Sequence, residues 1–394
     1  MLPEGWHRMT VADICQMQNG NGFGPEDWGT QGYPIIRIQN LNGGANFDYY
    51  SGPVQTRWLV EPGQLLFAWA GTKGVSFGPA IWSGRTGVLN QHIFKVSARE
   101  GIDKNWLYWA LRHVTDRIEA NAHGFKATLV HVKKSDIDRQ EVLVPDLNAQ
   151  RRIADALAVW EAAIDVAERQ LINNCKQKDA LSQAFDWGGR RLKNHSEAAL
   201  RPHASDLFTP ISIRRNQNAE LLSVTQEQGV IPRRLLDRKV VMPEGATDSY
   251  KLVEPGDFVI SLRSFEGGLE YSKFRGLVSP AYTVLRAKLP ICDDFYRHYF
   301  KSRDFISRLS VAVIGIRDGK QISYDDFAFL KIPSPPIEVQ RKVADVLNDA
   351  EHEIELLANH LEALKAEKRA LMADLLTGKR RVRMPDTTAE PEAA

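Results

Sequence analysis

The stretch that decides the fold is QRRIADAL at Gln150–Leu157, because it recurs as QRKVADVL at Gln340–Leu347, 190 residues further along the chain. A second matching pair, VEPG at Val60–Gly63 and at Val253–Gly256, lies at an offset of 193. This spacing is far longer than the period of a solenoid repeat, which is about 20–50 residues. The sequence therefore predicts two copies of one larger unit in tandem.

Both copies of the stretch begin a long helical pattern. Apolar residues recur in alternating steps of four and three, which is the heptad seam of a coiled coil. Proline and glycine are absent from both patterns, and Gly188 and Gly378 follow as helix stops. A solitary helix of this length would expose its apolar stripe, so we expect the two helices to pack on each other. The alternative is that each helix lies on its own domain. The predicted packing residues are Ile153, Leu157, Trp160, Ile164, Leu171, Leu347, Ile354, Leu357, Leu361 and Leu371.

The segments that precede the long helices mix strand-like and helix-like patterns, which predicts an α+β fold class with two mixed domains. Strand-like runs are Ile35–Ile38, Gln64–Ala68 and His92–Val96 in the first segment, and Leu221–Val224, Asp257–Ile260 and Tyr282–Leu285 in the second. A shorter amphipathic helix is expected in each segment, at Trp106–Ile118 and at Phe295–Leu309. The predicted boundaries are a first domain at 1–146, a first helix at 147–187, a linker and second domain at 188–336, a second helix at 337–378, and a basic, then disordered, tail at 379–394.

Composition excludes several classes of protein. The 394 residues are 43% apolar and 25% charged, which is ordinary for globular domains. No apolar run is long enough for a transmembrane helix, and the N-terminus lacks the apolar core of a signal peptide. The three cysteines lie far apart in the sequence, which fits a reducing cytoplasm better than a disulfide framework.

The charge is too balanced for a protein that grips nucleic acid by electrostatics alone. The formal net charge is +2, residues 1–146 carry equal numbers of basic and acidic side chains, and residues 203–336 carry +3. If the chain binds DNA, we expect it to read shape or bases and to obtain part of its phosphate affinity from a partner.

Catalytic motifs are lacking in the sequence. It contains no phosphate-binding loop of the GxxxxGK[ST] type and no histidine or cysteine spacing typical of a metal site. SPAY at Ser279–Tyr282 is a faint match to the tetrapeptide of amino-methyltransferases, but its third position is alanine and no glycine-rich turn precedes it. We therefore expect neither a catalytic site nor a bound metal.

Side chains that read base edges remain as candidates, since arginine, lysine, asparagine and glutamine carry out most direct readout. Each is more often a solvated surface group, and the loops at 124–134 and 315–324 are favoured because they occupy equivalent positions in the repeat. The candidates are Arg37, Gln39, Asn40, Lys73, Arg85, Asn90, Gln91, Lys126, Thr128 and Lys133 in the first half, and Arg214, Arg215, Arg233, Arg234, Arg263, Arg275, Arg317, Lys320 and Tyr324 in the second.

Three further motifs occur along the chain, and their order is typical of one protein family. They are LPEGW at Leu2–Trp6, the proline-rich turn IPSPPIEVQR at Ile332–Arg341, and LLTGKRRV at Leu375–Val382. With the repeat and the long helices, they make the chain resemble the DNA-specificity subunit of a type I restriction–modification system, a phage-defence complex. The turn before the first helix, VPDLNAQ at Val144–Gln150, departs from that pattern in lacking a double proline.

The resemblance implies two target-recognition domains, each reading one half of a bipartite site in double-stranded DNA, and an antiparallel coiled-coil spacer made by the long helices. It also implies two methyltransferase subunits that bind S-adenosylmethionine, and translocase/endonuclease subunits that use ATP and Mg. The chain itself would be non-catalytic and bind no cofactor. The alternatives are a specificity factor of another DNA-modifying defence complex, a methyltransferase or nuclease with unrecognised motifs, and a scaffold that does not bind DNA.

Overall fold

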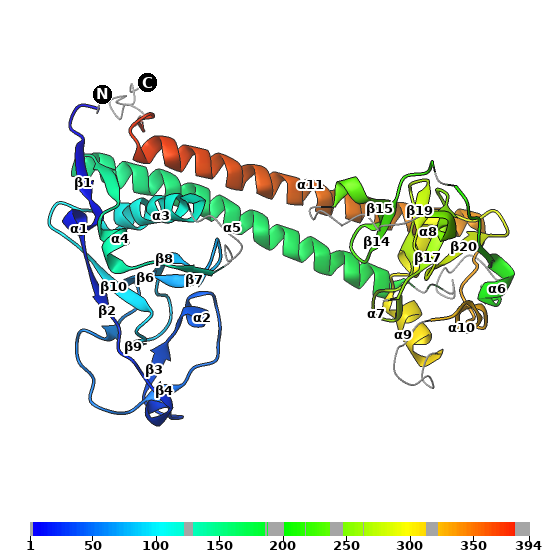
Figure 1. Cartoon of the computed structure of the whole chain (residues 1–394), viewed down its shortest axis with the longest axis horizontal. Coiled ribbons are helices and arrows are strands. Elements are labelled where there is room, and N and C mark those ends of the chain that lie inside the picture. Colours follow the sequence, from blue (N-terminus) through cyan, green and yellow to red (C-terminus); the bar gives the residue numbers. More distant parts are fainter. Residues whose placement is uncertain are drawn as a thin grey trace, which may run out of the picture. The chain divides into compact units, whose positions relative to one another are not determined.

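The computed structural model describes residues 3–121, 129–185, 187, 201–216, 218–236, 247–262, 264–312 and 322–382. The chain divides into unit 1, made of Met1–Glu168 with His360–Ala394, and unit 2, made of Arg169–Asn359. Each unit contains one globular part and adjoining portions of two long helices (Figure 1). The predicted α+β class with tandem mixed domains is confirmed.

The long helices are α5 (Leu147–Ala184, 38 residues) and α11 (Ile337–Leu376, 40 residues). The Asp146 side chain caps α5, since its Oδ1 accepts a hydrogen bond from the backbone N–H of Ala149 at 2.9 Å. After α11 the chain turns at Gly378, whose φ of 71° suits glycine.

Salt bridges show the direction of the two helices. In unit 1, Glu161 of α5 pairs with Lys368 of α11, and Glu168 pairs with Lys365 at 2.9 Å. Because the residue numbers fall along α11 as they rise along α5, the helices run antiparallel, as the resemblance implied.

In unit 1, strands β1–β10 come before α3, which is the longest helix that lies wholly within this unit. Its elements are β1 (His7–Thr10), α1 (Val11–Ile14), β2 (Cys15–Asn19), the 3-10 turn η1 (Pro25–Asp27), β3 (Tyr33–Ile36), α2 (Ile38–Leu41), β4 (Tyr49–Tyr50), β5 (Leu59–Val60), β6 (Leu65–Ala68), β7 (Ala70–Thr72), β8 (Gly78–Ile81), β9 (Gly87–Leu89), β10 (Ile93–Ala98), α3 (Lys104–Asn121), β11 (Leu129–His131), α4 (Lys134–Asp138) and β12 (Glu141–Val144).

The main sheet of unit 1 has the order β2-β10-β6-β8 and is covered by α3. Aromatic and aliphatic side chains such as Trp106 and Phe67 fill the space between them. Met372, Leu375 and Leu376 of α11 complete the same core, so the end of the chain is part of unit 1. A second sheet, β4-β3-β9-β5, lies away from α3 and α5 (Figure 1).

Unit 2 repeats this plan with shorter helices. Its elements are α6 (Ala204–Leu207), β13 (Phe208–Ile211), β14 (Leu222–Thr225), β15 (Gly229–Pro232), the 3-10 turns η2 (Arg233–Leu235) and η3 (Thr247–Ser249), β16 (Lys251–Val253), β17 (Phe258–Ile260), α7 (Ser264–Gly267), β18 (Glu270–Tyr271), β19 (Gly276–Val278), β20 (Thr283–Ala287), α8 (Asp293–Tyr299), α9 (Arg303–Ala312) and α10 (Tyr324–Ala328).

The sheet order β13-β20-β17-β18 corresponds to β2-β10-β6-β8 of unit 1. Its core is rich in phenylalanine, with Phe208, Phe258 and Phe300 in mutual ring contact, and Leu347 of α11 is fully buried in it. The prediction of one helix at Phe295–Leu309 is wrong. The hydroxyl of Ser302 donates to the carbonyl of Tyr299 and accepts from the N–H of Phe305, which ends α8 and starts α9.

Two glutamines show how closely the repeat is kept. Gln150 accepts a hydrogen bond from the backbone N–H of Asp103 at 2.8 Å, and Gln340 accepts one from Cys292 at 2.9 Å. Each also donates to the carbonyl of a proline five residues earlier. Both side chains are buried. The same amide therefore joins the start of each long helix to the loop before α3 or α8.

None of the ten predicted packing residues is exposed. Buried members are Ile153, Leu157, Ile164, Leu347 and Leu361, and half-buried members are Trp160, Leu171, Ile354, Leu357 and Leu371. Some of them pack in the globular cores, namely Ile153 and Leu157 in unit 1 and Leu347 in unit 2. The ends of the helices thus serve the domains as well as the helix pair.

The repeat also relates two ion pairs. Glu161 and Lys368 pair in unit 1, and Lys178 Nζ lies 2.7 Å from Glu351 Oε1 in unit 2. An offset of 190 converts Glu161 into Glu351 and Lys178 into Lys368. Burial alone would raise the pKa of Glu351, but Lys178 and Arg297 outweigh it and lower that pKa to about 2.

A buried carboxylate makes the stability of unit 2 depend on pH. Burial raises the pKa of Glu270 to about 7, even though Lys301 lies 2.6 Å away. Because the ordinary value is 4.5, the folded unit binds a proton that the unfolded chain releases. The stabilisation from this group is therefore complete below pH ~4.5 and is lost as the pH rises through ~7.

We expect Glu270→Gln to remove this contribution, so that the loss of unfolding free energy between pH 5 and pH 8 shrinks by on the order of 3 kcal/mol. Trp187, the single tryptophan of unit 2, reports on this unit in 5-fluorotryptophan NMR during urea unfolding. Glu266→Gln, at an exposed position of α7, is the control. An unchanged difference between the two pH values would contradict the prediction.

Candidate nucleic-acid interface

Two predicted residues of unit 1, Arg37 and Arg85, converge on β4. Arg37 forms an ion pair with Asp48, and its guanidinium lies 4.6 Å from the ring centroid of Trp28. Arg85, in the turn between β8 and β9, lies 5.1 Å from the ring of Tyr49. The structure therefore joins two turns that are distant in sequence into one group of arginine–aromatic pairs.

Asn40 holds its own loop together. This side chain is buried, its Nδ2 donates to the carbonyls of Gly44 and Asn46 at 3.0 and 2.9 Å, and its Oδ1 accepts from the N–H of Arg37. These bonds fix the loop, and the contact of Asn40 with a base stays a prediction. The neighbouring Gln39 is exposed.

The remaining candidates of unit 1 differ in their surroundings. Lys73 donates to the carbonyl of Glu119 at 2.7 Å, which fixes the turn after β7 to α3. Lys133 is exposed just before α4, and Asn90 and Gln91 lie between β9 and β10. Lys126 and Thr128 lie outside the described residues.

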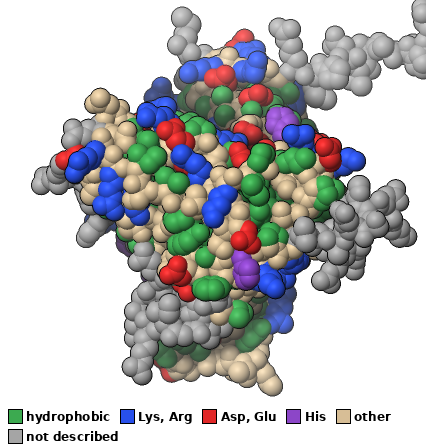
Figure 2. All heavy atoms as spheres, turned by 90° about the vertical axis from the view of Figure 1, so that its right-hand side faces the viewer, with side chains coloured by type: hydrophobic (Ala, Val, Ile, Leu, Met, Phe, Trp, Pro, Cys, Tyr) green, Lys and Arg blue, Asp and Glu red, His purple; other side chains and the backbone are tan. Residues whose placement is uncertain are grey.

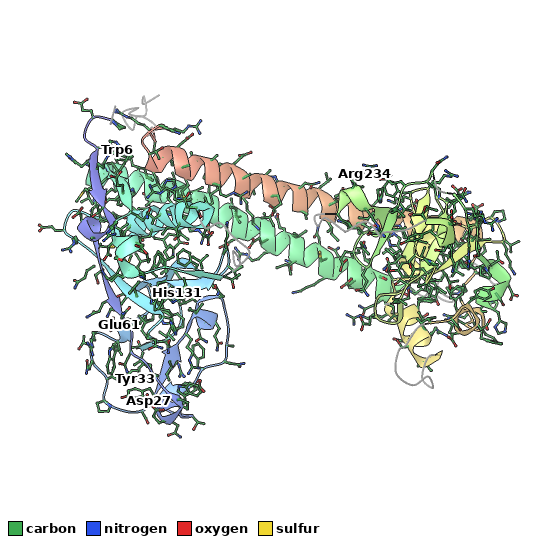
Figure 3. The ribbon with its side chains drawn as sticks, viewed as in Figure 1. Trp6, Asp27, Tyr33, Glu61, His131 and Arg234 are labelled. Atoms are coloured by element: carbon green, nitrogen blue, oxygen red, sulfur yellow. The ribbon has the colours of Figure 1, made fainter. Side chains whose placement is uncertain are left out.

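An aromatic group beside β7 and β11 was not among the residues predicted from the sequence. The Trp69 ring lies 5.2 Å from that of His92 and 4.7 Å from that of His131, and its indole N–H donates to the carbonyl of Gln91. His92 and His131 are exposed and Trp69 is half-buried. Figure 3 shows that His131, in β11, lies apart from Tyr33, in the strand that pairs with β4. Bases stack on such side chains. The pairing of β10 with β6 brings His92 to Trp69, and the pairing of β11 with β7 brings His131 there.

In unit 2 the predicted residues form a more basic surface. Arg214 and Arg215 are exposed after β13, and Arg215 has a φ of 64°, which is rare for this residue type. Burial and the charge of Arg214 lower the pKa of the nearby Lys251. Within the part of the chain that the structure describes, no carboxylate lies within salt-bridge distance of these two arginines. They are therefore available to an anion such as a DNA phosphate.

Two further basic positions follow β15 and precede β19. Arg233 has a buried Nε that finds no hydrogen-bond partner among the described residues, whereas Arg234 pairs with Glu220 at 3.0 Å. Arg275 pairs with Glu254 at 3.1 Å. In the view onto unit 2, basic side chains are interspersed with acidic and apolar ones (Figure 2). This mixture fits the nearly neutral charge of the sequence.

Tyr324 makes a structural contact in unit 2, and its contact with DNA stays a prediction. Its hydroxyl donates to the carbonyl of Phe208 at 3.1 Å, which ties α10 to β13. Arg263, Arg317 and Lys320 lie outside the described residues. The turns that carry Arg214, Arg233 and Arg275 are therefore the basis of the unit 2 candidate.

The described residues of these surfaces do not form a recognisable site for cleaving a bond. The described residues contain no group of three or more histidine, cysteine or carboxylate side chains that could hold a metal ion. Among the helices in the described ranges, none has the length and hydropathy needed to cross a membrane. What both units offer is arginine, amide and aromatic side chains on turns, which suits recognition of a nucleic acid.

Comparison with known proteins decides the family. Residues 3–177 match the family described as the type I restriction modification DNA specificity domain. Two specificity subunits of Methanocaldococcus jannaschii align with nearly the whole chain. MjaX, a putative one, is 21% identical over 97% of this chain and 95% of its own length, and MjaVIII is 22% identical over 97% and 94%. Residues 3–177 therefore belong to this family.

Other relatives agree with that membership. The EcoBI specificity subunit of Escherichia coli is 26% identical over 43% of this chain, a match that spans only 35% of that longer protein. Among solved structures, the S subunit of the type I system of M. genitalium has a TM-score of 0.50 at 16% identity, covering 96% of this chain and 97% of that chain. A chain from a study of the assembly and conformational transition of a type I system has a TM-score of 0.62 at 15% identity, covering 96% and 100%.

The two structural likenesses show the shared fold, and the sequence matches give the functional class. The chain is a type I specificity subunit, a non-catalytic subunit for DNA recognition.

Proposed function

We propose that this specificity subunit reads a bipartite, asymmetric DNA site, with unit 1 recognising one half-site and unit 2 the other. The observation that carries the proposal is a repeat whose framework is kept while its surface turns differ. Gln150 and Gln340 make the same contacts, and the main sheets have the same order.

The surface turns of the two units carry different chemistry. Unit 1 presents the Trp69–His92–His131 group and the pairs of Arg37 and Arg85 with aromatic rings. Unit 2 presents arginines on turns next to β13, β15 and β19. Because base edges are distinguished by the donors and acceptors that face them, two such surfaces would read different sequences.

The helix pair is the proposed docking surface for two methyltransferase subunits, and the translocase/endonuclease subunits would join that assembly. Val159 and Val166 of α5 are exposed in unit 1, and Val346 and Leu356 of α11 are exposed in unit 2. Val166 and Leu356 correspond at the offset of 190. Exposed apolar positions that recur on both helices support two equivalent partners.

The same proposal places S-adenosylmethionine, ATP and Mg on the partner subunits and the complex in the cytoplasm. The near-zero net charge supports a division of labour in which the methyltransferases supply much of the phosphate affinity.

The decisive experiment exchanges unit 1 for that of a relative with a known site. The exchange must include residues 360–394 with residues 1–168, because Met372, Leu375 and Leu376 belong to the core of unit 1. We expect methylation mapping of the assembled hybrid to show one altered half-site and one unchanged half-site.

Exchange of unit 2, residues 169–359, is the matched control and should alter only the other half-site. A hybrid in which both half-sites change would contradict independent reading. A properly assembled hybrid in which neither half-site changes would show that these units do not determine the sequence.

A further inference from the structure

Unit 1 contains a hollow that plays no part in the function proposed above. Its volume is about 600 Å³, and it lies where α3, α5 and the end of β8 meet (Figure 1). The floor consists of Tyr108 and Trp109 of α3, with their rings 4.8 Å apart, and of small side chains of α5, Ala158 and Ala162.

The rim of this hollow is acidic. Asp155, Glu161 and Asp165, all from α5, line it. Lys368 reaches Glu161 from α11, but it is not part of the lining. The hollow thus combines an aromatic and aliphatic floor with several carboxylates, which are the surroundings that a cation with an apolar stem prefers.

Unit 2 shows what occupies the equivalent place. The helices α3 and α8 correspond at an offset of 189, since the loops held by Gln150 and Gln340 are those of Asp103 and Cys292. Arg297 therefore stands at the position of Tyr108.

The guanidinium of Arg297 fills the site in unit 2. Its Nη1 donates to Glu351 at 2.6 Å, its Nε to Asp294 at 2.8 Å and its Nη2 to Asn348 at 2.7 Å. Asn348 also donates to Asp294 at 3.1 Å. One half-buried guanidinium thereby joins α8 to α11 through charge-assisted hydrogen bonds.

Unit 1 keeps Glu161 and its partner Lys368, the counterparts of Glu351 and Lys178, but lacks the arginine that is the second partner of Glu351. Tyrosine replaces Arg297 at position 108, alanine replaces Asn348 at position 158, and asparagine replaces Asp294 at position 105. Among the residues that the structure describes, no guanidinium lies within salt-bridge distance of Glu161. The hollow of unit 1 is lined by Tyr108 and Ala158, which stand at the positions of Arg297 and Asn348.

We propose that this hollow is a docking site for an arginine side chain of a partner protein. The guanidinium would pair with Glu161 and the neighbouring carboxylates and lie against the ring of Tyr108, while its methylenes contact Ala158 and Ala162. Arginine fits better than lysine, because a planar guanidinium both stacks on a ring and binds carboxylates through two parallel hydrogen bonds.

Among the described residues, Arg297 occupies the equivalent place in unit 2, so the hollow would make the two units unequal for a partner. A protein that inserts an arginine here recognises unit 1 and is excluded from unit 2, where Arg297 already occupies the place. This inference does not depend on DNA reading and is tested without DNA.

The first test titrates the full-length protein with an acetylated and amidated pentapeptide, Ala-Ala-Arg-Ala-Ala, and follows the 5-fluorotryptophan resonance of Trp109. We expect that resonance to shift, and the citrulline version of the peptide to bind at least about tenfold more weakly, because it keeps the shape but loses the charge. Equal affinity for the two peptides, or no binding, would overturn the proposal.

The second test fills the hollow. Ala158 is exposed, so Ala158→Gln occupies the space without threatening the fold, and we expect it to weaken the arginine peptide by about tenfold or more. Ala163→Gln, exposed on the same helix but outside the lining, is the control and should bind as the parent protein does.

A triple variant, Asn105→Asp with Tyr108→Arg and Ala158→Asn, rebuilds the unit 2 network inside unit 1. We expect this protein to lose peptide binding altogether while unit 1 stays folded. If either filled protein binds the arginine peptide as tightly as the parent, the hollow is not the docking site.

Discussion

Replacing Leu347 by aspartate is expected to unfold unit 2. Leu347 is fully buried where α11 enters the phenylalanine-rich core. The substitution removes a large apolar side chain and places an unpaired carboxylate in that core, which together costs about 4–5 kcal/mol or more. This is comparable to the whole stability of a typical domain, about 5–15 kcal/mol. The 5-fluorotryptophan resonance of Trp187 measures the effect, since its side chain belongs to the same core.

The matched control is Leu356→Asp on the same helix. Leu356 is 55% exposed, so its replacement should change the unfolding free energy by less than about 1 kcal/mol. It should instead interfere with docking of the methyltransferase, if the helix pair is the docking surface. A Leu347→Asp protein that keeps the native resonance of Trp187 would show that α11 does not contribute to the core of unit 2.

The repeat and the helix pair were predictable because they are recorded in residue spacing. The offset of 190 between QRRIADAL and QRKVADVL fixes the equivalence of α5 and α11, and the heptad steps fix which faces are covered. The break between α8 and α9 was not predictable from periodicity. It depends on the hydroxyl of Ser302, whose bonds to Tyr299 and Phe305 compete with a continuous helix.

The candidate interface was predictable only in residue type. Asn40 and Tyr324 have suitable side chains for reading bases, but in the structure Asn40 bonds its own loop and the Tyr324 hydroxyl donates to Phe208. Conversely, Trp69, His92 and His131 are far apart in the sequence, and strand pairing brings their rings together. Sequence spacing reports on neighbours within one element, whereas a surface assembled from several turns depends on the pairing of all of them.

The helix pair also allows a test of how the spacing between half-sites is set. We expect four residues inserted after Glu168 in α5, together with four after Asn359 in α11, to widen the nonspecific gap of the DNA site by one or two base pairs. Both insertions fall at the boundary between unit 1 and unit 2. The ion pairs Glu161–Lys368 and Lys178–Glu351 then remain within their own units.

The expected change follows from helix and DNA geometry. Four residues add about 6 Å of helical rise, close to two base-pair steps of about 3.4 Å each. They also add about 40° of rotation beyond a full turn, close to the twist of one step, about 35°. The coiled coil absorbs four residues as a local stutter, so the apolar seams of the two helices stay in contact.

Methylation mapping of the assembled variant measures both the half-sequences and the gap between them. The same four residues appended after Ala394 serve as the control for a longer chain, and an insertion in α5 alone should disrupt the helix pairing and reduce assembly. If the matched double insertion leaves the gap unchanged, the helices do not measure the distance between the half-sites. If it changes a half-sequence, each unit does not read its DNA independently of the spacer.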